Sequence, residues 1–251
     1  MRKPIPRIST RGYYDLSSGK TIKNNRYFLY PKKSFERLYC QNEITIMIHG
    51  LRNNSQGAVN KFAIAKRRLN QIGYNYPVIG FSYDSNIRGA HLKKSELHAL
   101  KVGQRIAQKN GKNLCNFIID FKKKSPKTKI RLIGHSLGTQ VILSAIENLA
   151  KHKHIRGILE TVYFFGASII AGIPASGKYQ KMFQKIIKGK VVNYFAPTDE
   201  VLTYAHVHGQ VVNPLGLEGS SVRSTSKYIQ KKVRPKNHRF ISYAAVLRKF
   251  P

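Results

Sequence analysis

The strongest chemical signal in the chain is a serine flanked by glycines, in the run GHSLG at residues 134–138. A serine can attack a carbonyl when it lies on a sharp turn between a strand and a helix, where small neighbours leave its hydroxyl exposed. The apolar segment 129–133 precedes this run, and the apolar segment 141–150 follows it directly. The sequence therefore predicts that Ser136 is a nucleophile on a strand-to-helix turn.

Acyl transfer also needs donors for the negative charge that develops on the carbonyl oxygen. The helix that follows the serine points its first amides toward that charge, which predicts the Leu137 amide as one donor. The second donor is expected from the loop that contains Gly50, because glycine lets the backbone approach the substrate. We assign it to the Leu51 amide, with the Arg52 amide as the neighbouring alternative.

A general base must accept the proton of the serine. In the chain order serine, acid, histidine, the base follows the acid, which leaves His206, His208 and His238. His238 precedes an expected final helix, where a loop histidine can reach over the edge of a sheet. His238 is therefore the favoured base, and His206 and His208 are the alternatives.

An acid must hold the base in the productive tautomer and stabilise its charged form. Few acids follow Ser136 in the chain, and Asp199 lies just after an apolar segment at 191–195. That position is the carboxyl end of an expected strand, where the sites of α/β proteins collect. Asp199 is the predicted acid, and Glu200 is the alternative. We expect no metal ligation by His206 and His208, since no partner ligands stand nearby in the sequence.

These residues need a scaffold, and the apolar pattern supplies alternating strands and helices. Apolar runs predict strands at 44–48, 78–83, 129–133, 159–165 and 191–195; helical spacing predicts helices at 56–72, 95–123, 141–150 and 176–187. The only candidate for a last strand is 209–212. The alternation predicts an α/β fold, with a mostly parallel sheet and helices on both faces.

The chain resembles the α/β-hydrolase superfamily over about residues 43–250. The matching features are IHG at 48–50, GHSLG at 134–138, DEVL at 199–202 and Asn237-His238. It is most similar to compact esterase-like or lipase-like members. The resemblance implies hydrolysis of carboxylic esters by Ser136, His238 and Asp199, without a metal or an organic cofactor.

The domain organisation is expected to be simple. At 251 residues the chain suits one α/β domain, over 43–251, with residues 1–42 as an irregular or short-stranded lead-in packed on it. No large cap domain is inserted, so the site should be open and covered by short loops such as 84–94 and 167–188. Cys40 and Cys115 lack disulfide or zinc spacing and are predicted to be core thiols.

The charge of the chain is extreme, because 45 Lys and Arg face 11 Asp and Glu, for a net charge of +34. Such a surface attracts nucleic acid and anionic lipid in a salt-dependent way. The expected partners are therefore small-molecule or lipid esters, together with anionic membrane or nucleic acid. The alternative function is a catalytically inactive hydrolase fold that binds polyanions. No secretory signal is readable, which predicts a cytoplasmic protein that can contact membranes peripherally.

Overall fold

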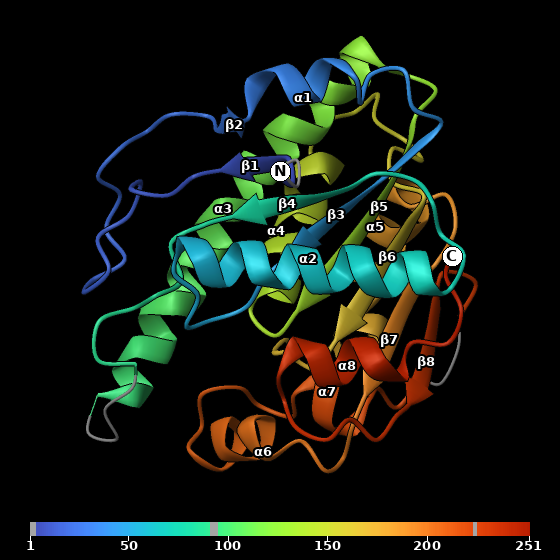
Figure 1. The fold of residues 1–251 in the computed structure, drawn as a ribbon. Helices are drawn as coiled ribbons and strands as arrows, with labels where there is room; N and C mark the ends of the chain where they lie inside the picture. The colour runs from blue at the N-terminus through green and yellow to red at the C-terminus, as the bar shows by residue number, and fades with distance from the viewer. Residues whose placement is uncertain (1–3, 91–94, 223–224) are drawn as a thin grey trace.

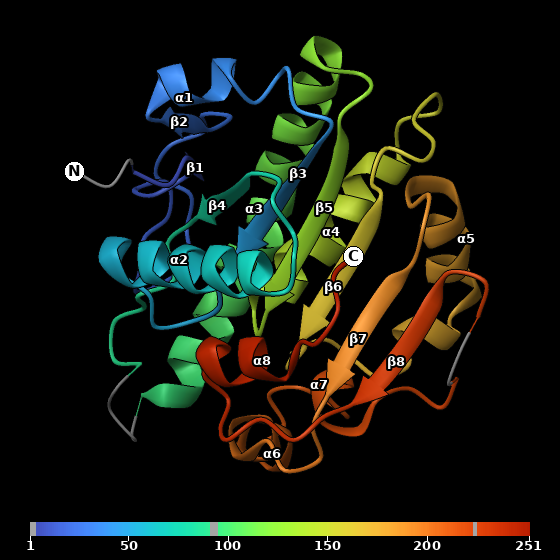
Figure 2. The same cartoon turned by 45° about the vertical axis from the view of Figure 1, so that its right-hand side comes forward.

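The computed structural model describes residues 4–90, 95–222 and 225–251. A single sheet runs through the middle of the molecule (Figures 1 and 2), and its strand order is β2-β1-β4-β3-β5-β6-β7-β8. The strands are β1 (Arg7–Ser9), β2 (Phe28–Tyr30), β3 (Glu43–Ile48), β4 (Val78–Ser82), β5 (Lys129–His135), β6 (Thr161–Phe165), β7 (Val191–Phe195) and β8 (Tyr228–Lys232). The β1–β2 pair is antiparallel and the other pairs are parallel. The predicted mostly parallel sheet is confirmed.

Helices cover both faces of this sheet. One face carries α2 (Ser55–Gln71) and α8 (Phe240–Val246), and the other carries α3 (Glu96–Lys124), α4 (Gly138–Ala150) and α5 (Gly177–Ile186), as Figures 1 and 2 show. The remaining helices are short: α1 (Lys32–Glu36), η1 (Ile173–Ala175), α6 (Glu200–Val207) and α7 (Leu215–Glu218). Over the three described ranges, no helix has both the length and the apolar character needed to cross a membrane.

The predicted elements form for the reasons that the sequence indicated. All six residues of β3 are buried, as expected for an inner strand of a parallel sheet covered on both faces. In α2 the residues at helical spacing, Ala58, Phe62, Ala65 and Leu69, are the buried ones. Asn54 caps α2, because its side-chain oxygen accepts a hydrogen bond from the Gly57 amide at 2.8 Å.

The last strand lies elsewhere than expected. Residues 209–212 form a turn after α6, whereas β8 at Tyr228–Lys232 pairs with β7. The prediction was wrong because β8 is an edge strand in which only Tyr228 is fully buried. Its two terminal lysines are exposed, which protects a sheet edge but removes the apolar pattern of a strand.

The lead-in adds two strands to the main sheet. Strand β1 pairs in parallel with β4, and β2 pairs with β1. Cys115 is buried in α3 as expected, but Cys40 is exposed in the turn after α1, so the prediction of two core thiols was half wrong. The lead-in therefore forms one edge of the sheet.

Only part of the segment 167–188, which was expected to cover the site, lies at the carboxyl edge of the sheet. The segment 167–188 divides into a first part whose backbone bonds to residues 213–215 and a second part, α5, which packs on α4 behind the sheet. The helices α6 and α7 also lie at the carboxyl edge (Figure 1). Part of the loop 84–94 lies outside the described residues. In the described part of the chain no large cap domain is inserted.

The order of the strands creates a point where the chain direction across the sheet reverses. From β3 the chain crosses to β4 on one side, while from β5 it proceeds to β6 and β7 on the other. The connections that leave the carboxyl ends of β3 and β5 therefore run toward opposite edges of the sheet. In open α/β sheets this reversal point is where ligands bind.

Candidate active site

Ser136 lies at this reversal point, on the turn between β5 and α4. Its backbone has a φ of 53°, a left-handed conformation that is uncommon for a residue with a side chain. Two neighbours hold the turn: the Ser136 amide donates to Phe165 O at 3.0 Å, and the Ser136 carbonyl accepts from the Thr139 amide at 3.0 Å. The strained turn is thus imposed by the surrounding structure, and it leaves Ser136 half-buried rather than fully buried like its neighbours His135 and Leu137.

Glycines allow the neighbouring backbones to approach this turn. A Cβ on Gly138 would lie 2.3 Å from the carbonyl oxygen of Ile48, so α4 could not pack against β3. A Cβ on Gly50 would lie 2.8 Å from the Cβ of Ser136. The loop after β3 therefore passes directly beside the serine because it has glycine there.

A buried carboxylate and a histidine form a second part of the site. Asp199 lies at the amino end of α6, and its Oδ2 accepts a hydrogen bond from His238 Nδ1 at 2.7 Å. The same oxygen accepts from the Tyr243 hydroxyl at 2.6 Å, and Oδ1 accepts from the Leu202 amide at 3.1 Å. Three donors from two helices and one loop thus fix the orientation of the carboxylate.

The surroundings keep this carboxylate charged. Burial by itself would raise the pKa of Asp199, but the hydrogen bonds from His238 and Tyr243, the charge of His238 and the Leu202 amide outweigh it and lower the pKa. Burial and the neighbouring carboxylate raise the pKa of the Tyr243 hydroxyl, so that group stays protonated and remains a donor. Asp199 can therefore stabilise a positive charge on the imidazole.

The other nitrogen of the imidazole has no partner. His238 Nε2 is buried and makes no hydrogen bond to any residue that the structure describes, including Ser136. His135 Nε2 donates to the His238 carbonyl oxygen at 2.7 Å, and the two rings lie 5.0 Å apart. The residue before the serine thus contacts the candidate base. Hydrogen bonds between a nucleophile and its base often tighten only when substrate binds.

Two further histidines near the site are neutral. Burial, reinforced by the charge of Arg11, lowers the pKa of His49 to about 3. Burial and the charge of His238 likewise place the pKa of His135 well below its ordinary value. His49 Nδ1 donates to Gly50 O at 2.9 Å, and His49 stacks on Tyr83. Both rings therefore act as uncharged hydrogen-bonding groups in the wall of the site.

Two backbone amides are available as oxyanion donors. Neither the Leu51 amide nor the Leu137 amide donates a hydrogen bond within the described residues. The Arg52 amide, by contrast, donates to Ser85 O at 2.8 Å, which excludes it from this role in the observed conformation. The arrangement leaves Leu51, rather than Arg52, as the candidate donor from this loop.

An arginine of the lead-in supports the same loop. Arg11 Nη2 donates to Asn53 O at 3.1 Å and to Asn54 O at 3.0 Å, and its Nε donates to Ser82 Oγ at 2.7 Å. Sequence reasoning missed this contact, because a lone arginine in a polar segment carries no signal of its long-range partners. The contact of Tyr243 with Asp199 was missed for the same reason, although a tyrosine on the helix that follows His238 is close enough in sequence to suggest a position beside the site.

The alternative residues lie apart from the Asp199 carboxylate. His206 Nδ1 accepts a hydrogen bond from the Asn213 amide, and its Nε2 lies 4.0 Å from Glu218. His208 Nδ1 donates to Tyr204 O at 2.8 Å. Of the three candidate bases, His238 is the one that the structure pairs with Asp199.

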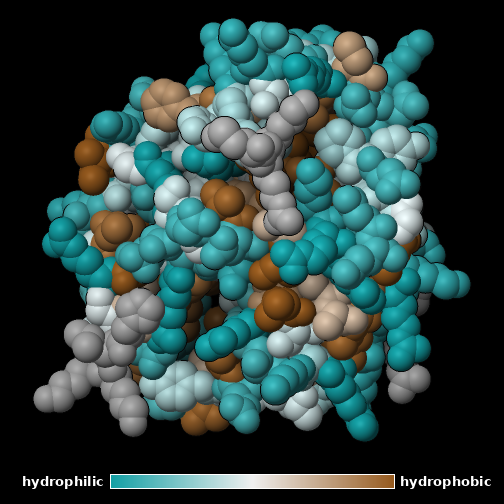
Figure 3. Space-filling view, in the orientation of Figure 1, coloured by the Kyte–Doolittle hydropathy of each residue, from teal (hydrophilic) through white to brown (hydrophobic). Residues whose placement is uncertain are grey.

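Apolar side chains are exposed on the two helices that follow Asp199 and His238. Val201 and Val207 of α6 are 53% and 73% exposed, and Ile241, three residues after His238, is 54% exposed. Figure 3 shows a mostly hydrophilic face with a hollow in the region that α2, α6 and α8 surround in Figure 1, and apolar groups around it. An apolar part of a ligand would find partners here.

Comparisons with known proteins give distant relationships. A family model described as a protein of unknown function (DUF726) matches residues 98–218. An uncharacterized membrane protein of Caenorhabditis elegans is 28% identical over 108 residues, which are 43% of this chain and 15% of that protein. The chain therefore matches only a small part of the length of that relative.

Solved structures with a similar fold include two hydrolase-related proteins. A lipase-esterase related protein from Clostridium acetobutylicum is 14% identical, covers 80% of this chain and 88% of its own, and has a TM-score of 0.38. A cutinase from Trichoderma reesei is 16% identical, covers 62% of this chain and 67% of its own, and has a TM-score of 0.33.

Proposed function

We propose that the protein is a serine hydrolase that cleaves carboxylic esters. Ser136 is the nucleophile, His238 the general base and Asp199 the acid that orients it. The observation that carries the proposal is the strained serine turn at the reversal point of the sheet, joined through His135 to a buried Asp–His pair. If the serine turn or the Asp–His pair had only a structural role, the two features would not need to lie next to each other.

The proposed reaction has two steps. In the first, Ser136 Oγ bonds to the ester carbonyl carbon, its proton passes to His238 Nε2, and the carbonyl oxygen becomes an oxyanion that the Leu51 and Leu137 amides stabilise. The C–O bond to the alcohol then breaks, and the imidazolium returns its proton to the leaving alcohol. In the second step water, deprotonated by His238, attacks the acyl carbon; the bond from that carbon to Ser136 Oγ breaks, the imidazolium gives its proton to Oγ, and the carboxylic acid leaves.

The surroundings support an ester with an apolar acyl group. The exposed side chains of Val201, Val207 and Ile241 would contact such a group beside the site. The net charge of +34 would favour a substrate presented at an anionic surface. Small-molecule and lipid esters are both included in the proposal.

The test is covalent labelling with a fluorophosphonate probe, followed by mass spectrometry. We expect the label on Ser136, and we expect Ser136→Ala and His238→Ala to abolish it and to reduce hydrolysis of short-chain esters by on the order of 10⁴-fold. Ser17→Ala, which removes an exposed serine of the lead-in, is the matched control and should change neither readout.

Absence of labelling in the folded wild-type protein would contradict the proposal. The high positive charge would then favour the alternative, a catalytically inactive hydrolase fold that binds polyanions. A steep salt dependence of DNA or anionic-vesicle binding, unchanged by Ser136→Ala, would support that alternative.

A further inference from the structure

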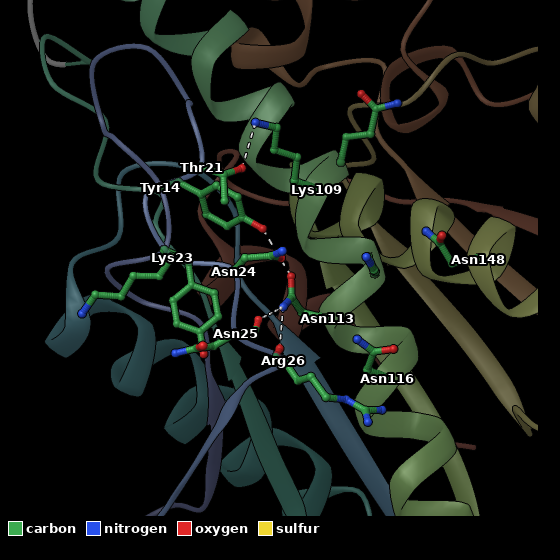
Figure 4. Close-up of a pocket in the computed structure, with 13 residues that line it drawn as sticks. Tyr14, Thr21, Lys23, Asn24, Asn25, Arg26, Lys109, Asn113, Asn116 and Asn148 are labelled. Atoms are coloured by element: carbon green, nitrogen blue, oxygen red, sulfur yellow. Dashed lines mark hydrogen bonds between the residues drawn. The ribbon is translucent and has the colours of Figure 1, made fainter.

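A cavity lies far from the serine. It has a volume of about 500 Å³ and is formed by the lead-in, the middle of α3 and Asn148 of α4 (Figure 4). Asn148 is near the end of α4 opposite to Ser136, and the 13 residues of this helix span about 20 Å. The cavity also lies on the α3 and α4 face of the sheet, whereas α8 lies on the other face. It is therefore separate from the candidate active site.

Hydrogen bonds attach the lead-in to α3 around this cavity. Lys109 Nζ donates to Gly19 O at 3.0 Å and to Thr21 Oγ1 at 3.2 Å, and Asn113 Nδ2 donates to Asn25 O at 3.0 Å. In the lead-in, the three successive backbone amides of Gly12, Tyr13 and Tyr14 donate hydrogen bonds to the Asp84 carboxylate, which follows β4. The lead-in segment 12–25 is thus fixed to α3 and to the residues after β4. The cavity is the space that remains open between these hydrogen bonds.

The lining of the cavity is positively charged. Its cationic residues are Lys23, Arg26, Lys109 and Lys112, and none of its described lining residues is acidic. Arg26 pairs with Asp120 at 3.0 Å, but within the described ranges the three lysines form no ion pair. The contacts of Lys109 are with neutral oxygens and leave its charge uncompensated. The cavity therefore favours an anionic ligand.

The lining also offers neutral hydrogen-bonding groups. Asn24, Asn116 and Gln108 face the cavity, and their side chains make no hydrogen bond to another described residue. Each amide presents both donors and an acceptor, which suits hydroxyl groups and phosphate oxygens. The volume is that of a site for a small organic molecule.

We propose that this cavity binds a phosphorylated, hydroxyl-bearing small molecule, either free as a sugar phosphate or as the polyol phosphate headgroup of a lipid. The lysines bind the phosphate oxygens as charged donors, and the asparagine side chains bind the hydroxyls and remaining oxygens. This inference does not depend on hydrolysis at Ser136, and its test measures binding alone.

The test is calorimetric titration of the full chain at 150 mM salt, about physiological ionic strength, with fructose 1,6-bisphosphate as the soluble probe. We expect saturable binding at one site per chain, and no binding of fructose. Lys23→Gln with Lys112→Gln should weaken binding at least about tenfold. Asn116→Ala, which leaves the net charge unchanged, should weaken it about tenfold as well, because a hydrogen bond to a charged group is lost.

Matched variants separate a built site from general attraction to a basic protein. Lys127→Gln with Lys181→Gln removes two exposed lysines outside the cavity, and Asn60→Ala removes an exposed amide of α2. Both should bind the bisphosphate as the wild type does. Equal weakening by both lysine pairs, or more than one bisphosphate per chain, would overturn the proposal. So would equally strong binding of citrate.

A vesicle arm identifies the source of the phosphate. Flotation with vesicles that contain phosphatidylinositol 4-phosphate is compared with flotation on phosphatidylserine vesicles of equal charge. Preference for the phosphoinositide, lost in Lys23→Gln with Lys112→Gln and in Asn116→Ala, would support the lipid headgroup. The same variant dependence with the soluble probe alone would support a free ligand. Absence of this variant dependence in both arms would overturn the proposal.

Discussion

The position of the imidazole depends on a single carboxylate oxygen. Asp199 Oδ2 accepts from both His238 Nδ1 and the Tyr243 hydroxyl, at 2.7 and 2.6 Å. Because Tyr243 comes from α8, immediately after the loop that carries His238, it can fix the carboxylate that in turn fixes the imidazole. Tyr243 is therefore a positioning residue in the proposed reaction and does not touch the reacting atoms.

Tyr243→Phe tests this role. The variant keeps the ring, which packs 6.3 Å from Phe165, and removes only the donor. We expect kcat for ester hydrolysis to fall about tenfold, with KM nearly unchanged, since a hydrogen bond to a buried charged group is lost. Loss of a hydrogen bond that lowers the Asp199 pKa should also move the acid limb of the pH–rate profile to higher pH. Steady-state kinetics across pH measure both effects.

Tyr204→Phe is the matched control for this change, because the Tyr204 side chain is exposed on α6. It should leave kcat and the acid limb as in the wild type. A Tyr243→Phe variant that behaves like this control would show that the hydroxyl does not position the carboxylate.

At the scale of elements, the serine turn depends on how α4 is seated. Gly111 of α3 faces Ser144 of α4, and a Cβ at this glycine would lie 2.6 Å from the backbone carbonyl carbon of Ser144. Ser144 Oγ also donates to Gln108 O at 2.8 Å, which ties the two helices together at the same place. Since α4 begins two residues after Ser136, its packing on α3 determines where Ser136 lies.

Gly111→Ala should therefore destabilise the protein. The added methyl group meets backbone and cannot be accommodated by a side-chain rotation, so we expect a loss of about 2–3 kcal/mol in the free energy of unfolding. Urea unfolding at neutral pH measures it. Gly177→Ala, at the first position of α5 with nothing within 4 Å of the added carbon, should change stability by less than about 1 kcal/mol. Equal stability of the two variants would contradict the close packing of α3 on α4.

At the scale of the whole molecule, the pH dependence of stability is determined by where positive charge is excluded rather than by the net charge. The net charge of +34 leaves most basic groups without an acidic partner, yet the two buried histidines beside Ser136, His49 and His135, are neutral. Protonation of His49 and His135 is opposed by burial, and for both the nearby positive groups oppose it further. The folded protein thus disfavours the protonated, positively charged forms of these two buried histidines.

This exclusion predicts how stability depends on pH. Below about pH 6.5 the unfolded chain protonates both histidines, whereas the folded chain does not until much lower pH, near 3 for His49. The unfolded state then binds more protons, so the free energy of unfolding rises with pH and falls on acidification. Between pH 6 and 5 we expect a loss of as much as about 1.4 kcal/mol per pH unit for each histidine.

Urea unfolding at a series of pH values measures this slope. His49→Gln should reduce the slope, because one of the two protonation sites is removed. His98→Gln, which replaces an exposed histidine at the start of α3, should leave it unchanged. A slope that does not respond to His49→Gln would contradict the assignment of a neutral imidazole there.

The sequence by itself determined the alternation of strands and helices and the position of the serine turn. The strands at 44–48 and 191–195 and the helix at 56–72 were predicted within a few residues. The physical reason is that these features depend on near neighbours: apolar periodicity decides which face is buried, and glycines beside a serine permit a tight turn. The choice of candidate bases likewise used only the order of serine, acid and histidine along the chain.

Only the tertiary structure decided which distant side chains meet. Arg11 contacts the loop at 53–54, and Tyr243 contacts Asp199 across 44 positions, but neither pair leaves a local pattern in the sequence. The last strand was misplaced because pairing with β7, rather than its own apolar content, makes β8 a strand. The basic cavity likewise exists because the lead-in folds over α3. Such contacts follow from the packing of whole elements, which local propensity does not encode.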